Sequence, residues 1–525
     1  EQTALSIMES ADCAIGYEAA HMVYKGLVGY RDDYIEHIKN GRCTCTYNQP
    51  VPCVALCPAH VDIPGYIALV REGRYEDAIR LIRKDNPFPT TCGFICEHPC
   101  EALCRRNMID DAVNIRGLKR MAADAAGYVA PPECAESTGK NIAVVGGGPG
   151  GLSAAYFLQL MGHQVTVYEM LPKLGGMLRY GIPNYRLPKE RLDDDIQAIL
   201  DTGVKVDCGK AIGKDYSIVD LKEKYDAVLI TIGASTDKKL GLEGEDAKGV
   251  ISAVQFLRNV GYGTQESLEG KEVAVIGGGN VSMDAVRTSV RLGAKKVSIV
   301  YRRRVADMTA LPDEISGAEA EGVEIKTLMA PSRIEKDEEG NVKGIWVTPQ
   351  MISNIKGGRA SVKPTGEDDV FIPCQTLIVA IGQDIEYQHF EEAGVPVQRG
   401  KINVEKFGGF EEMPGVFAGG DCATGPSTVI SAIAAGKVIA ANIDEYLGYH
   451  HEITADVEIP EPKLEDKPAC GRVNLTEREA GERVKDFEGV ENCMTEKEAC
   501  QEAGRCLRCD HFGYGIFKGG RDTKW

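Results

Sequence analysis

Cysteine thiols are the groups in this sequence whose number and spacing point most directly to chemistry, since 18 of its 525 residues are cysteines. Eight of them form two groups: Cys43, Cys45, Cys53 and Cys57, then Cys92, Cys96, Cys100 and Cys104. In a reducing compartment such groups are typical of metal or iron–sulfur ligands and not of disulfides. No histidine stands beside them at a zinc-like spacing, which favours two four-cysteine clusters of the 4Fe-4S type over two structural zinc sites.

A further concentration of cysteines lies near the end of the chain, and its spacing is less informative. The residues are Cys493, Cys500, Cys506 and Cys509. This spacing matches no ferredoxin-type run, so a third iron–sulfur cluster, a zinc site and free thiols all stay open for this segment.

A glycine-rich turn between two apolar runs indicates a binding site for a dinucleotide. Its glycines are Gly146, Gly148 and Gly151, in the pattern Gly-x-Gly-x-x-Gly. We expect a strand over 142–145, then a helix, and a second strand over 164–168 that ends at Glu169. The pyrophosphate would lie on the helix N-terminus, and Glu169 would accept hydrogen bonds from ribose hydroxyls. A glycine loop without a ligand is the less favoured alternative.

A second unit of the same kind begins at Lys271. Its glycines are Gly277 and Gly279, followed by Asn280, Val281 and, in place of the third glycine, Ser282. Where an acid would accept the ribose 2′-hydroxyl, this unit has Tyr301, and Arg302, Arg303 and Arg304 follow. Arginines at this place favour a 2′-phosphate, so the unit is predicted to bind NADPH in preference to NADH. The alternative is that these arginines form only a solvated face.

Other residues are predicted to complete the two sites. Gly233 and Gly382 fall near the ends of the apolar runs 225–234 and 375–384. Gly176 would let the backbone approach a ligand closely, and Arg186 would supply positive charge beside it. Gly420 and Asp421 precede a helix of small residues, whose N-terminus could hold the ribityl chain and pyrophosphate of a flavin.

The order of these features predicts an α/β protein in which a helical iron–sulfur domain is followed by two interleaved Rossmann-like domains. The expected parts are a helical extension at 1–40, a helical domain with two clusters at 41–134, a flavin-binding domain at 135–268 and 385–455, a nicotinamide-nucleotide domain at 269–384, and a cysteine-rich tail at 456–525. Gly93 and Pro99 are expected to interrupt any regular helix across the second cysteine group.

Charge and hydropathy exclude several functions. The net charge of −18 argues against nucleic acids and anionic membranes as partners. No apolar run approaches the roughly 20 residues that a membrane-spanning helix needs. The first residues lack the pattern of a secretory signal, so we expect a cytoplasmic location.

Several motifs, taken in order, resemble one family of oxidoreductases. They are CVALCP, CEHPCEALC, VVGGGPGGLSAA, GGMLRYGIPNYRLPKE, VIGGGNVSMDAVRT, VYRRR and FAGGDCATGPSTV. The family includes the glutamate synthase small subunit, the N-terminal half of dihydropyrimidine dehydrogenase and the large subunit of NADH-dependent reduced ferredoxin:NADP oxidoreductase. The resemblance covers about residues 40–450 and implies FAD, NADP(H) and two 4Fe-4S clusters as cofactors.

The resemblance also implies which residues hold these cofactors. FAD would contact Gly146, Gly148, Gly151, Glu169, Gly176, Arg186, Gly420 and Asp421. NADPH would contact Gly277, Gly279, Asn280, Val281, Arg302, Arg303 and Gly382. One cluster would use Cys43, Cys45, Cys53 and Cys104, and the other Cys57, Cys96 and Cys100.

Two departures from the family affect the clusters. This chain has Cys43-x-Cys45 where relatives usually have Cys-x2-Cys, which leaves the ligands of the first cluster open. It also has Lys119 where some relatives use Gln or Glu as a fourth ligand. Because a lysine cation cannot ligate iron, Cys92 is predicted as the replacement.

The activity that the resemblance implies is electron transfer from NADPH. A flavin exchanges two electrons with a nicotinamide and single electrons with clusters, so it can join the two. Arg186 is our candidate for the charged group that tunes the flavin. We therefore expect an electron-transfer subunit whose partner is another redox protein, such as an NAD-linked flavoprotein or a ferredoxin-like protein.

The cysteine-rich segments and the resemblance also suggest a more specific function, flavin-based electron bifurcation. The two cysteine-rich segments flank the nucleotide domains in sequence, and would give electrons two exits if both held clusters. The resemblance to the transhydrogenase then favours flavin-based bifurcation between ferredoxin and NAD. The alternatives are a glutamate synthase small subunit and a non-catalytic scaffold or redox sensor.

Overall fold

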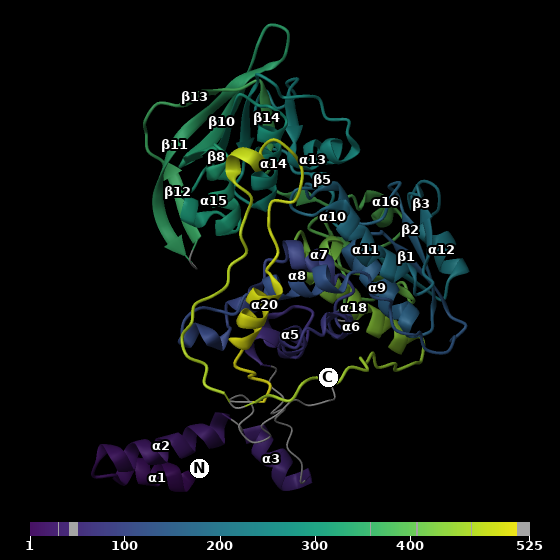
Figure 1. The fold of residues 1–525 in the computed structure, drawn as a ribbon, viewed down its shortest axis with the longest axis vertical. Helices are drawn as coiled ribbons and strands as arrows, with labels where there is room; N and C mark the ends of the chain where they lie inside the picture. The colour runs from purple at the N-terminus through teal and green to yellow at the C-terminus, as the bar shows by residue number, and fades with distance from the viewer. Residues whose placement is uncertain (30, 41–50, 357–358, 406–407, 464, 512–525) are drawn as a thin grey trace. The chain divides into compact units, whose positions relative to one another are not determined.

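The computed structural model describes residues 1–29, 31–40, 51–356, 359–405, 408–463 and 465–511 (Figure 1). The chain divides into two compact units, residues 1–51 with 508–525 and residues 52–507. In the first unit, helix α1 (Gln2–Ser10) packs against α2 (Ala14–Gly29), and α3 (Arg31–Asn40) follows. Ile15, Met22 and Val23 of α2 are exposed, so the described residues do not bury the apolar stripe of this helix.

The second unit begins with a domain of short helices. They are α4 (Pro52–Leu56), α5 (Ile63–Arg71), α6 (Tyr75–Arg83), α7 (Pro89–Ile95), η1 (Pro99–Glu101), η2 (Arg105–Met108) and α8 (Ile115–Ala126). Capping side chains explain where the two central helices begin. Asp62 accepts a hydrogen bond from a backbone N–H of α5, and Asn114 does the same for α8.

The chain across the second cysteine group was expected to interrupt a regular helix at Gly93 and at Pro99, and the helix is interrupted only near Pro99. Helix α7 ends before Pro99, and His98 has a φ of +43° in the turn between them. Gly93, however, lies inside α7 and does not break it. A Cβ atom on Gly93 would come within 2.9 Å of the Arg120 Cα, so this glycine permits close packing of α7 on α8.

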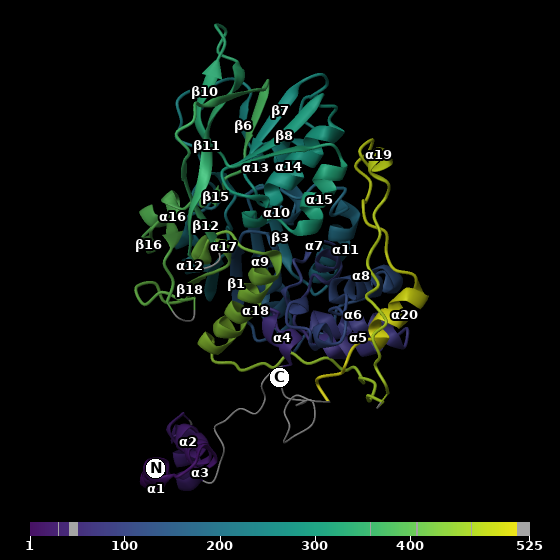
Figure 2. The same ribbon diagram turned by 90° about the vertical axis from the view of Figure 1, so that its left-hand side faces the viewer.

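A parallel five-stranded sheet follows the helical domain, in the order β18-β4-β1-β2-β3. Its strands are β1 (Asn141–Val145), β2 (Gln164–Glu169), β3 (Lys205–Cys208), β4 (Ala227–Ile230) and β18 (Val416–Ala418). The accompanying helices are α9 (Pro149–Leu160), α10 (Met177–Tyr180), α11 (Lys189–Leu200), α12 (Ile218–Lys224), α17 (Asp421–Thr424) and α18 (Val429–Tyr446). Helix α9 connects β1 to β2 and packs along α18 (Figure 2). Helices therefore cover the sheet, which explains the continuous apolar run of β1.

A second parallel sheet has the order β6-β14-β7-β8-β9. Its strands are β6 (Val250–Ser252), β7 (Glu272–Ile276), β8 (Lys296–Tyr301), β9 (Glu324–Thr327) and β14 (Thr376–Val379). Its helices are α13 (Ala253–Tyr262), α14 (Asn280–Arg291), η3 (Val305–Asp307) and α15 (Pro312–Ala320). An antiparallel group extends this part of the chain: β10 (Met329–Lys336), β11 (Val342–Lys356), β12 (Arg359–Pro364) and β13 (Val370–Pro373).

The two sheets are interleaved along the chain. After β4 the chain leaves the first sheet, builds the second one, and returns to the first sheet at β18. The outgoing segment β5 (Thr236–Asp237) pairs antiparallel with the returning segment β15 (Gln383–Asp384). The short elements β16 (Val397–Gln398), β17 (Lys401–Ile402) and α16 (Gln388–Glu392) lie between β15 and β18. This topology confirms the predicted architecture of two interleaved Rossmann-like domains behind a helical domain.

The tail is mostly extended and carries two short helices, α19 (Ala480–Arg483) and α20 (Glu496–Gly504). Helix α20 packs against α5 and α8 (Figure 1). The backbone N–H of Asn114 donates to the Glu502 carboxylate at 2.7 Å, and Arg505 pairs with both Glu502 and Asp110. The tail therefore completes the core of the helical domain.

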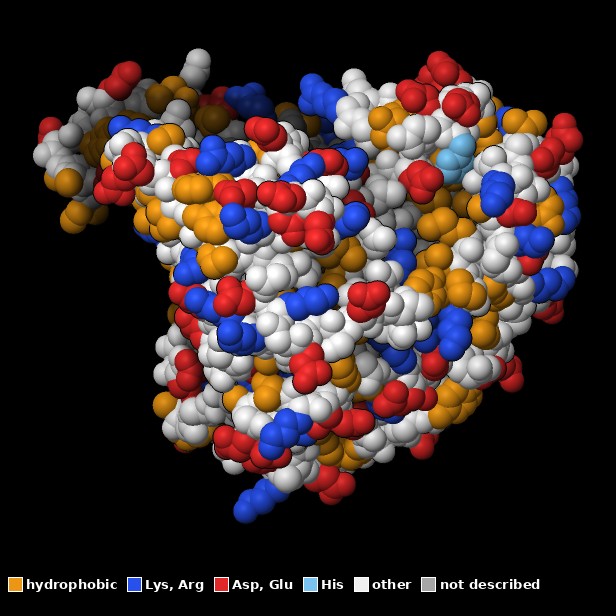
Figure 3. Space-filling view, turned by 90° about the horizontal axis from the view of Figure 1, so that it is seen from above, with side chains coloured by type: hydrophobic (Ala, Val, Ile, Leu, Met, Phe, Trp, Pro, Cys, Tyr) orange, Lys and Arg blue, Asp and Glu red, His pale blue; other side chains and the backbone are white. Residues whose placement is uncertain are grey.

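Surface properties agree with the composition. Acidic and basic side chains are interspersed on the face drawn in Figure 3. Within the described ranges, none of the helices has both the length and the apolar character that a membrane crossing requires.

Candidate functional site

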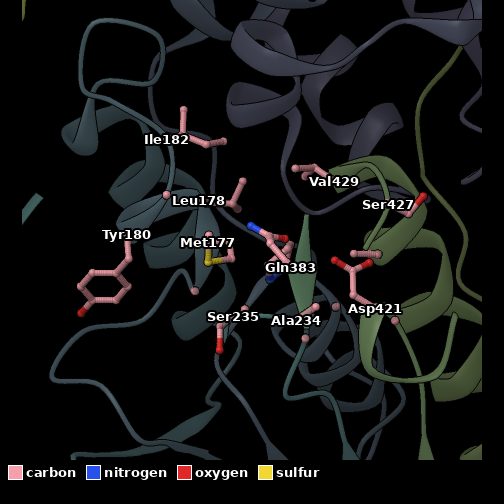
Figure 4. A pocket seen from close by; sticks show the side chains of 18 of the residues that line it. Met177, Leu178, Tyr180, Ile182, Ala234, Ser235, Gln383, Asp421, Ser427 and Val429 are labelled. Atoms are coloured by element: carbon pink, nitrogen blue, oxygen red, sulfur yellow. The ribbon is translucent and has the colours of Figure 1, made fainter. Parts of the chain in front are cut away.

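A cavity of about 260 Å³ is lined by residues of the first parallel sheet and its helices, of helices α13 and α14 beside the second sheet, and of the helical domain. Predicted residues that line it are Cys96, Gly146, Gly148, Glu169, Gly176, Arg186, Gly233, Asn280, Val281, Gly420 and Asp421. In Figure 4, the side chains of Met177, Gln383 and Asp421 extend toward a common space. The structure thus brings together residues that are as much as 325 positions apart, from Cys96 to Asp421.

The first glycine turn has room for a ligand at one of its three glycines. A Cβ atom on Gly146, whose φ is +109°, would lie 2.5 Å from the Thr231 carbonyl oxygen, and one on Gly151 would lie 2.0 Å from the Gly146 oxygen. On Gly148, a Cβ atom would meet no atom nearer than the Gly176 Cα at 3.9 Å. Gly148 precedes α9 and borders the cavity, so a pyrophosphate fits where a side chain is missing.

Two carboxyl groups face the same cavity. Glu169 accepts hydrogen bonds of 2.7 Å from the backbone N–H groups of Gly147 and Leu171, and burial raises its pKa. Burial raises the pKa of Asp421 to about 6. Hydroxyl donors of a ribose or ribityl chain would compensate for the desolvation of these carboxylates. This donor requirement fits the predicted FAD.

The helix behind Asp421 differs from the prediction. We expected one helix of small residues there, but the chain forms the short α17 first, and α18 begins at Val429 with Thr428 as its cap. Thr428 and Val429 also line the cavity. Two helix starts therefore border the cavity on this side, and Gly425, with a φ of +92°, follows the first of these helices.

Arg186 lies in the cavity wall with its charge already paired. Its Nη1 is 2.8 Å from an Asp284 carboxylate oxygen, and its Nε is 2.9 Å from Glu314. Asp284 belongs to α14 and Glu314 to α15. The guanidinium therefore joins the cavity wall to the second sheet's helices, which the sequence did not indicate.

The second glycine turn repeats the geometry of the first. Gly277 has a φ of +146°, and a Cβ atom there would lie 2.3 Å from the Ala380 carbonyl oxygen. The Ser282 side chain is completely buried behind it, so serine fits in place of a third glycine. Gly279 precedes α14, and a Cβ atom on it would meet nothing nearer than Thr309 Oγ1 at 3.3 Å. Gly382, with a φ of +132°, adjoins the cavity-lining Gln383.

The arginines after β8 are not equivalent. Arg303 Nε donates to the Ala360 carbonyl at 2.8 Å, and Arg304 forms an ion pair with Asp307. Arg302 is exposed, and among the described residues no hydrogen bond or ion pair involves its guanidinium. Arg302 is therefore the arginine with most freedom to bind a 2′-phosphate.

We expect the substitution Arg302→Ala to raise the KM for NADPH about tenfold or more while changing the KM for NADH little. The reason is that a charge-assisted hydrogen bond to a phosphate contributes roughly 1.5–3 kcal/mol. Steady-state kinetics with both nucleotides measure this. Arg304→Ala is the matched control, since Asp307 occupies that guanidinium. Equal losses with both nucleotides would show that Arg302 does not bind the phosphate.

Four buried cysteines surround a lysine in the helical domain. They are Cys57, Cys92, Cys96 and Cys100, and the positive charge of Lys119 acts to lower the pKa of each thiol. A hydrogen bond from Cys92 lowers the pKa of Cys96 to about 6. Burial opposes this and raises the pKa of Cys57 and Cys100, and the hydrogen bond to Cys96 together with burial raises the pKa of Cys92. Thiols gathered around a cation are suited to bind metal as thiolates.

The spacing of these thiols favours a cluster over a single ion. Across the described residues, no three cysteine sulfurs lie within 4.8 Å of one another, as ligands of one tetrahedral zinc ion must. A four-iron cluster is larger and accepts more widely spaced thiols. Of the cysteines predicted for the other cluster, Cys53 and Cys104 are partly buried. Cys43 and Cys45 lie outside the described residues.

The tail cysteines turn toward different neighbours. The Cys493 thiol contacts the Met121 sulfur of α8 at 3.8 Å, and the Cys500 thiol faces the Arg71 carbonyl at the end of α5. Cys506 lies one residue before the end of the second unit, and Cys509 belongs to the first unit. No metal-sized group in the described ranges includes a tail cysteine. A third centre therefore remains a prediction.

His163, Asp444 and His451 form a compact polar group away from the cavity. A nitrogen of each imidazole lies 2.8 Å from the same Asp444 oxygen, and Thr138 bonds the other nitrogen of His163. These are hydrogen-bond distances, so the group is a network that attaches the segment after α18 to the first sheet.

The sequence did not reveal Glu97 as a residue of the cavity wall, whereas Lys189 lies in the motif GGMLRYGIPNYRLPKE and is part of the positive charge expected beside the ligand. Glu97 accepts a hydrogen bond of 2.7 Å from the Asn280 side chain, which links the helical domain to the start of α14. Lys189 donates to the carbonyls of Leu178 and Ile182, and burial lowers its pKa to about 7. The Glu97–Asn280 contact joins segments whose proximity only the fold determines.

Comparison with known proteins supports this assembly. Residues 140–436 match the family described as pyridine nucleotide-disulphide oxidoreductase, and residues 30–129 match dihydropyrimidine dehydrogenase domain II, 4Fe-4S cluster. The structure of FprA from Mycobacterium tuberculosis in complex with NADPH aligns with a TM-score of 0.52 at 21% identity, over 59% of this chain and 85% of that one. The last likeness shows the fold alone.

Longer matches are found among characterised sequences. The beta subunit of NADP(+)-dependent formate dehydrogenase from Moorella thermoacetica is 38% identical, covering 89% of this chain and 72% of its own. The beta subunit of NADPH-Fe(3+) oxidoreductase from Geobacter sulfurreducens is 33% identical, covering 96% and 82%. The Escherichia coli glutamate synthase [NADPH] small chain is 34% identical, covering 75% and 88%. The chain therefore belongs to the family of NADPH-dependent oxidoreductases that combine FAD and NADP(H) sites on a pyridine nucleotide-disulphide oxidoreductase fold with a 4Fe-4S domain.

Proposed function

We propose that this chain takes electrons from NADPH at the described cavity and passes them through its helical iron–sulfur domain to another redox subunit. The observation that supports this route best is that Cys96 lines the same cavity as Gly148 and Asp421. A cluster ligand and the flavin site then share a wall. Two of the relatives are named as beta subunits, which supports a partner chain as the recipient.

The proposal assigns each cofactor to residues of this chain. FAD is held by residues 135–268 and 385–455, with contacts at Gly148, Glu169, Gly176 and Asp421. NADPH is held by residues 269–384, with contacts at Gly279, Asn280 and Arg302. One cluster uses Cys57, Cys92, Cys96 and Cys100, and the other uses Cys43, Cys45, Cys53 and Cys104.

In the proposed mechanism, the residues of this chain position the two nucleotides and bind their negative charges. Bound FAD supplies the exchange between the hydride of NADPH and single electrons. The N-termini of α9 and α14 offer backbone N–H groups to the two pyrophosphates. Arg186 holds α14 and α15 against the cavity wall through Asp284 and Glu314, and Glu97 holds the helical domain against Asn280. These contacts join the nucleotide sites to each other and to the cluster domain.

Anaerobic mixing with NADPH tests the route. We expect the flavin absorbance to bleach and reduced iron–sulfur signals to appear by EPR, with NADH much less effective. Bleaching of the flavin while the clusters stay oxidised would overturn the proposed route through Cys96.

Metal analysis tests the cofactor assignment separately. We expect about eight iron and eight acid-labile sulfide per chain, because eight cysteines form the two N-terminal groups. About twelve of each would indicate that the tail also holds a cluster. Elemental analysis by mass spectrometry and a colorimetric sulfide assay give both values. Zinc without iron would contradict the assignment.

The same observations bear on two more specific functions, glutamate synthesis and flavin-based bifurcation. A glutamate synthase small chain is the alternative, but that relative leaves a quarter of this chain unmatched, whereas the formate dehydrogenase subunit matches 89% of it. Bifurcation stays a prediction. Its second exit was expected in the tail, yet Cys493 and Cys500 face α8 and α5 of the same helical domain. A cytoplasmic location is part of the proposal because a reducing compartment keeps grouped thiols from pairing as disulfides.

A further inference from the structure

Lys119 is a buried cation for which the described residues supply no carboxylate partner. Its side chain, on α8, is 5% exposed. In the part of the chain that the structure describes, no carboxylate oxygen lies within 4.0 Å of its ammonium group. Removing an ionised ammonium from water costs several kcal/mol unless an opposite charge compensates for it. A negative partner of another kind is therefore required.

Helix α8 approaches α7 closely where Gly93 meets Arg120, so Lys119 lies next to the point where α8 contacts the segment of Cys92 and Cys96. The thiols of Cys57, Cys92, Cys96 and Cys100 are all buried and interact electrostatically with the Lys119 ammonium group. The other charges close by are already paired. Arg116, on the same helix, forms an ion pair with Glu491, and Glu101 forms one with Arg472. The compensating charge for Lys119 therefore comes from the thiolates and the cluster that they would bind.

A four-iron cluster held by four thiolates is an anion, and reduction adds one more negative charge to it. A fixed cation beside the cluster stabilises the reduced form more than the oxidised form, because Coulomb attraction increases with the charge. Burial strengthens this attraction, since the effective dielectric constant is lower than in water. We infer that Lys119 raises the reduction potential of the cluster bound by Cys57, Cys92, Cys96 and Cys100, acting through space and not as a ligand.

The position of this cluster determines how a raised reduction potential affects electron transfer. Cys96 lines the flavin cavity, so this cluster is the first acceptor of single electrons. A raised potential favours transfer from the flavin outward, and it makes the cluster a poor donor to a low-potential acceptor such as ferredoxin. The inference rests on the proposed function, because it requires a cluster at these cysteines.

The test is an EPR-monitored redox titration of the whole chain, carrying its FAD and clusters. Lys119→Met and Lys119→Gln remove the charge, and Lys119→Arg keeps it. Lys84→Met is the matched control, because Lys84 is a partly buried lysine of the same domain that pairs with Asp85. We expect both neutral variants to lower the equilibrium constant for cluster reduction at least tenfold, which is about 59 mV for one electron. Lys119→Arg and Lys84→Met should stay close to wild type.

The other possible results for the Lys119 variants also support or overturn the inference. If the neutral variants lose the iron of this cluster while Lys119→Arg keeps it, the charge is needed even to hold the cluster, which supports the inference. If Lys119→Arg loses the iron too, the role is one of shape and the inference is wrong. A neutral variant with full iron and an unchanged potential also overturns it. Wild-type protein without iron would instead overturn the proposed function.

Discussion

A Gly148→Val protein is expected to fold, to keep its iron and to purify without FAD. Valine fits the unliganded chain, since a Cβ atom at this position meets no protein atom within 3.9 Å. The backbone of Gly148 is extended, which a β-branched residue adopts easily. The added methyl groups would instead fill the space at the start of α9 where a pyrophosphate must lie.

The size of this effect follows from the contacts that would be lost. Two charge-assisted hydrogen bonds of roughly 1.5–3 kcal/mol each amount to about a hundredfold or more in FAD affinity. Visible absorbance, together with fluorescence of the flavin released on denaturation, measures bound FAD. Circular dichroism confirms folding.

Two other glycines make the comparison specific. Gly481→Val is the matched control, because a Cβ atom at Gly481 meets nothing within 4 Å and the residue lies in α19. Gly151→Ala should destabilise the protein itself, since its Cβ atom would lie 2.0 Å from the Gly146 carbonyl oxygen. A Gly148→Val protein with a full complement of FAD would place the pyrophosphate elsewhere.

The second large effect is expected from Cys92→Ser, which should remove roughly half of the iron. By the family resemblance, Lys119 stands where some relatives would have a Gln or Glu ligand, and the Cys92 thiol is fully buried beside Cys96 and Lys119. Serine replaces the thiolate by a weak ligand and leaves the neighbouring backbone unchanged. NADPH would then still bleach the flavin, but electrons would not reach the partner.

Iron analysis and EPR of the reduced protein measure this prediction. Cys374→Ser is the matched control, because Cys374 is equally buried but belongs to the second nucleotide domain. Full iron and a wild-type reduced spectrum in Cys92→Ser would show that the fourth ligand is another residue.

The nucleotide-binding part of the fold could be predicted because its signals are local. The turn at Gly146 and the turn at Gly277 each need a glycine with positive φ directly after a buried strand, and this requirement is visible in a few residues. The same holds for the helix starts at Asp62 and Asn114, which cap within three residues. Such features do not depend on distant parts of the chain.

The contacts between domains could not be predicted, because they join segments far apart in sequence. Arg186 was assigned a role beside the flavin from its charge and from the family resemblance, and neither indicated its ion pairs with Asp284 and Glu314 of another domain. Likewise, Arg302, Arg303 and Arg304 look alike as a run, and only the fold shows that Ala360 and Asp307 engage two of them. The antiparallel strands β10–β13 carry no motif at all.

The docked tail has a consequence for how the protein is made. The Asn114–Glu502 hydrogen bond spans 388 positions, and Arg116 pairs with Glu491 across 375. Helices α5 and α8 therefore leave the ribosome long before their last packing partner, α20, has been synthesised. Contacts of such separation form late. The faces of α5 and α8 that α20 covers therefore stay exposed until the end of synthesis, and the arrival of α20 buries them.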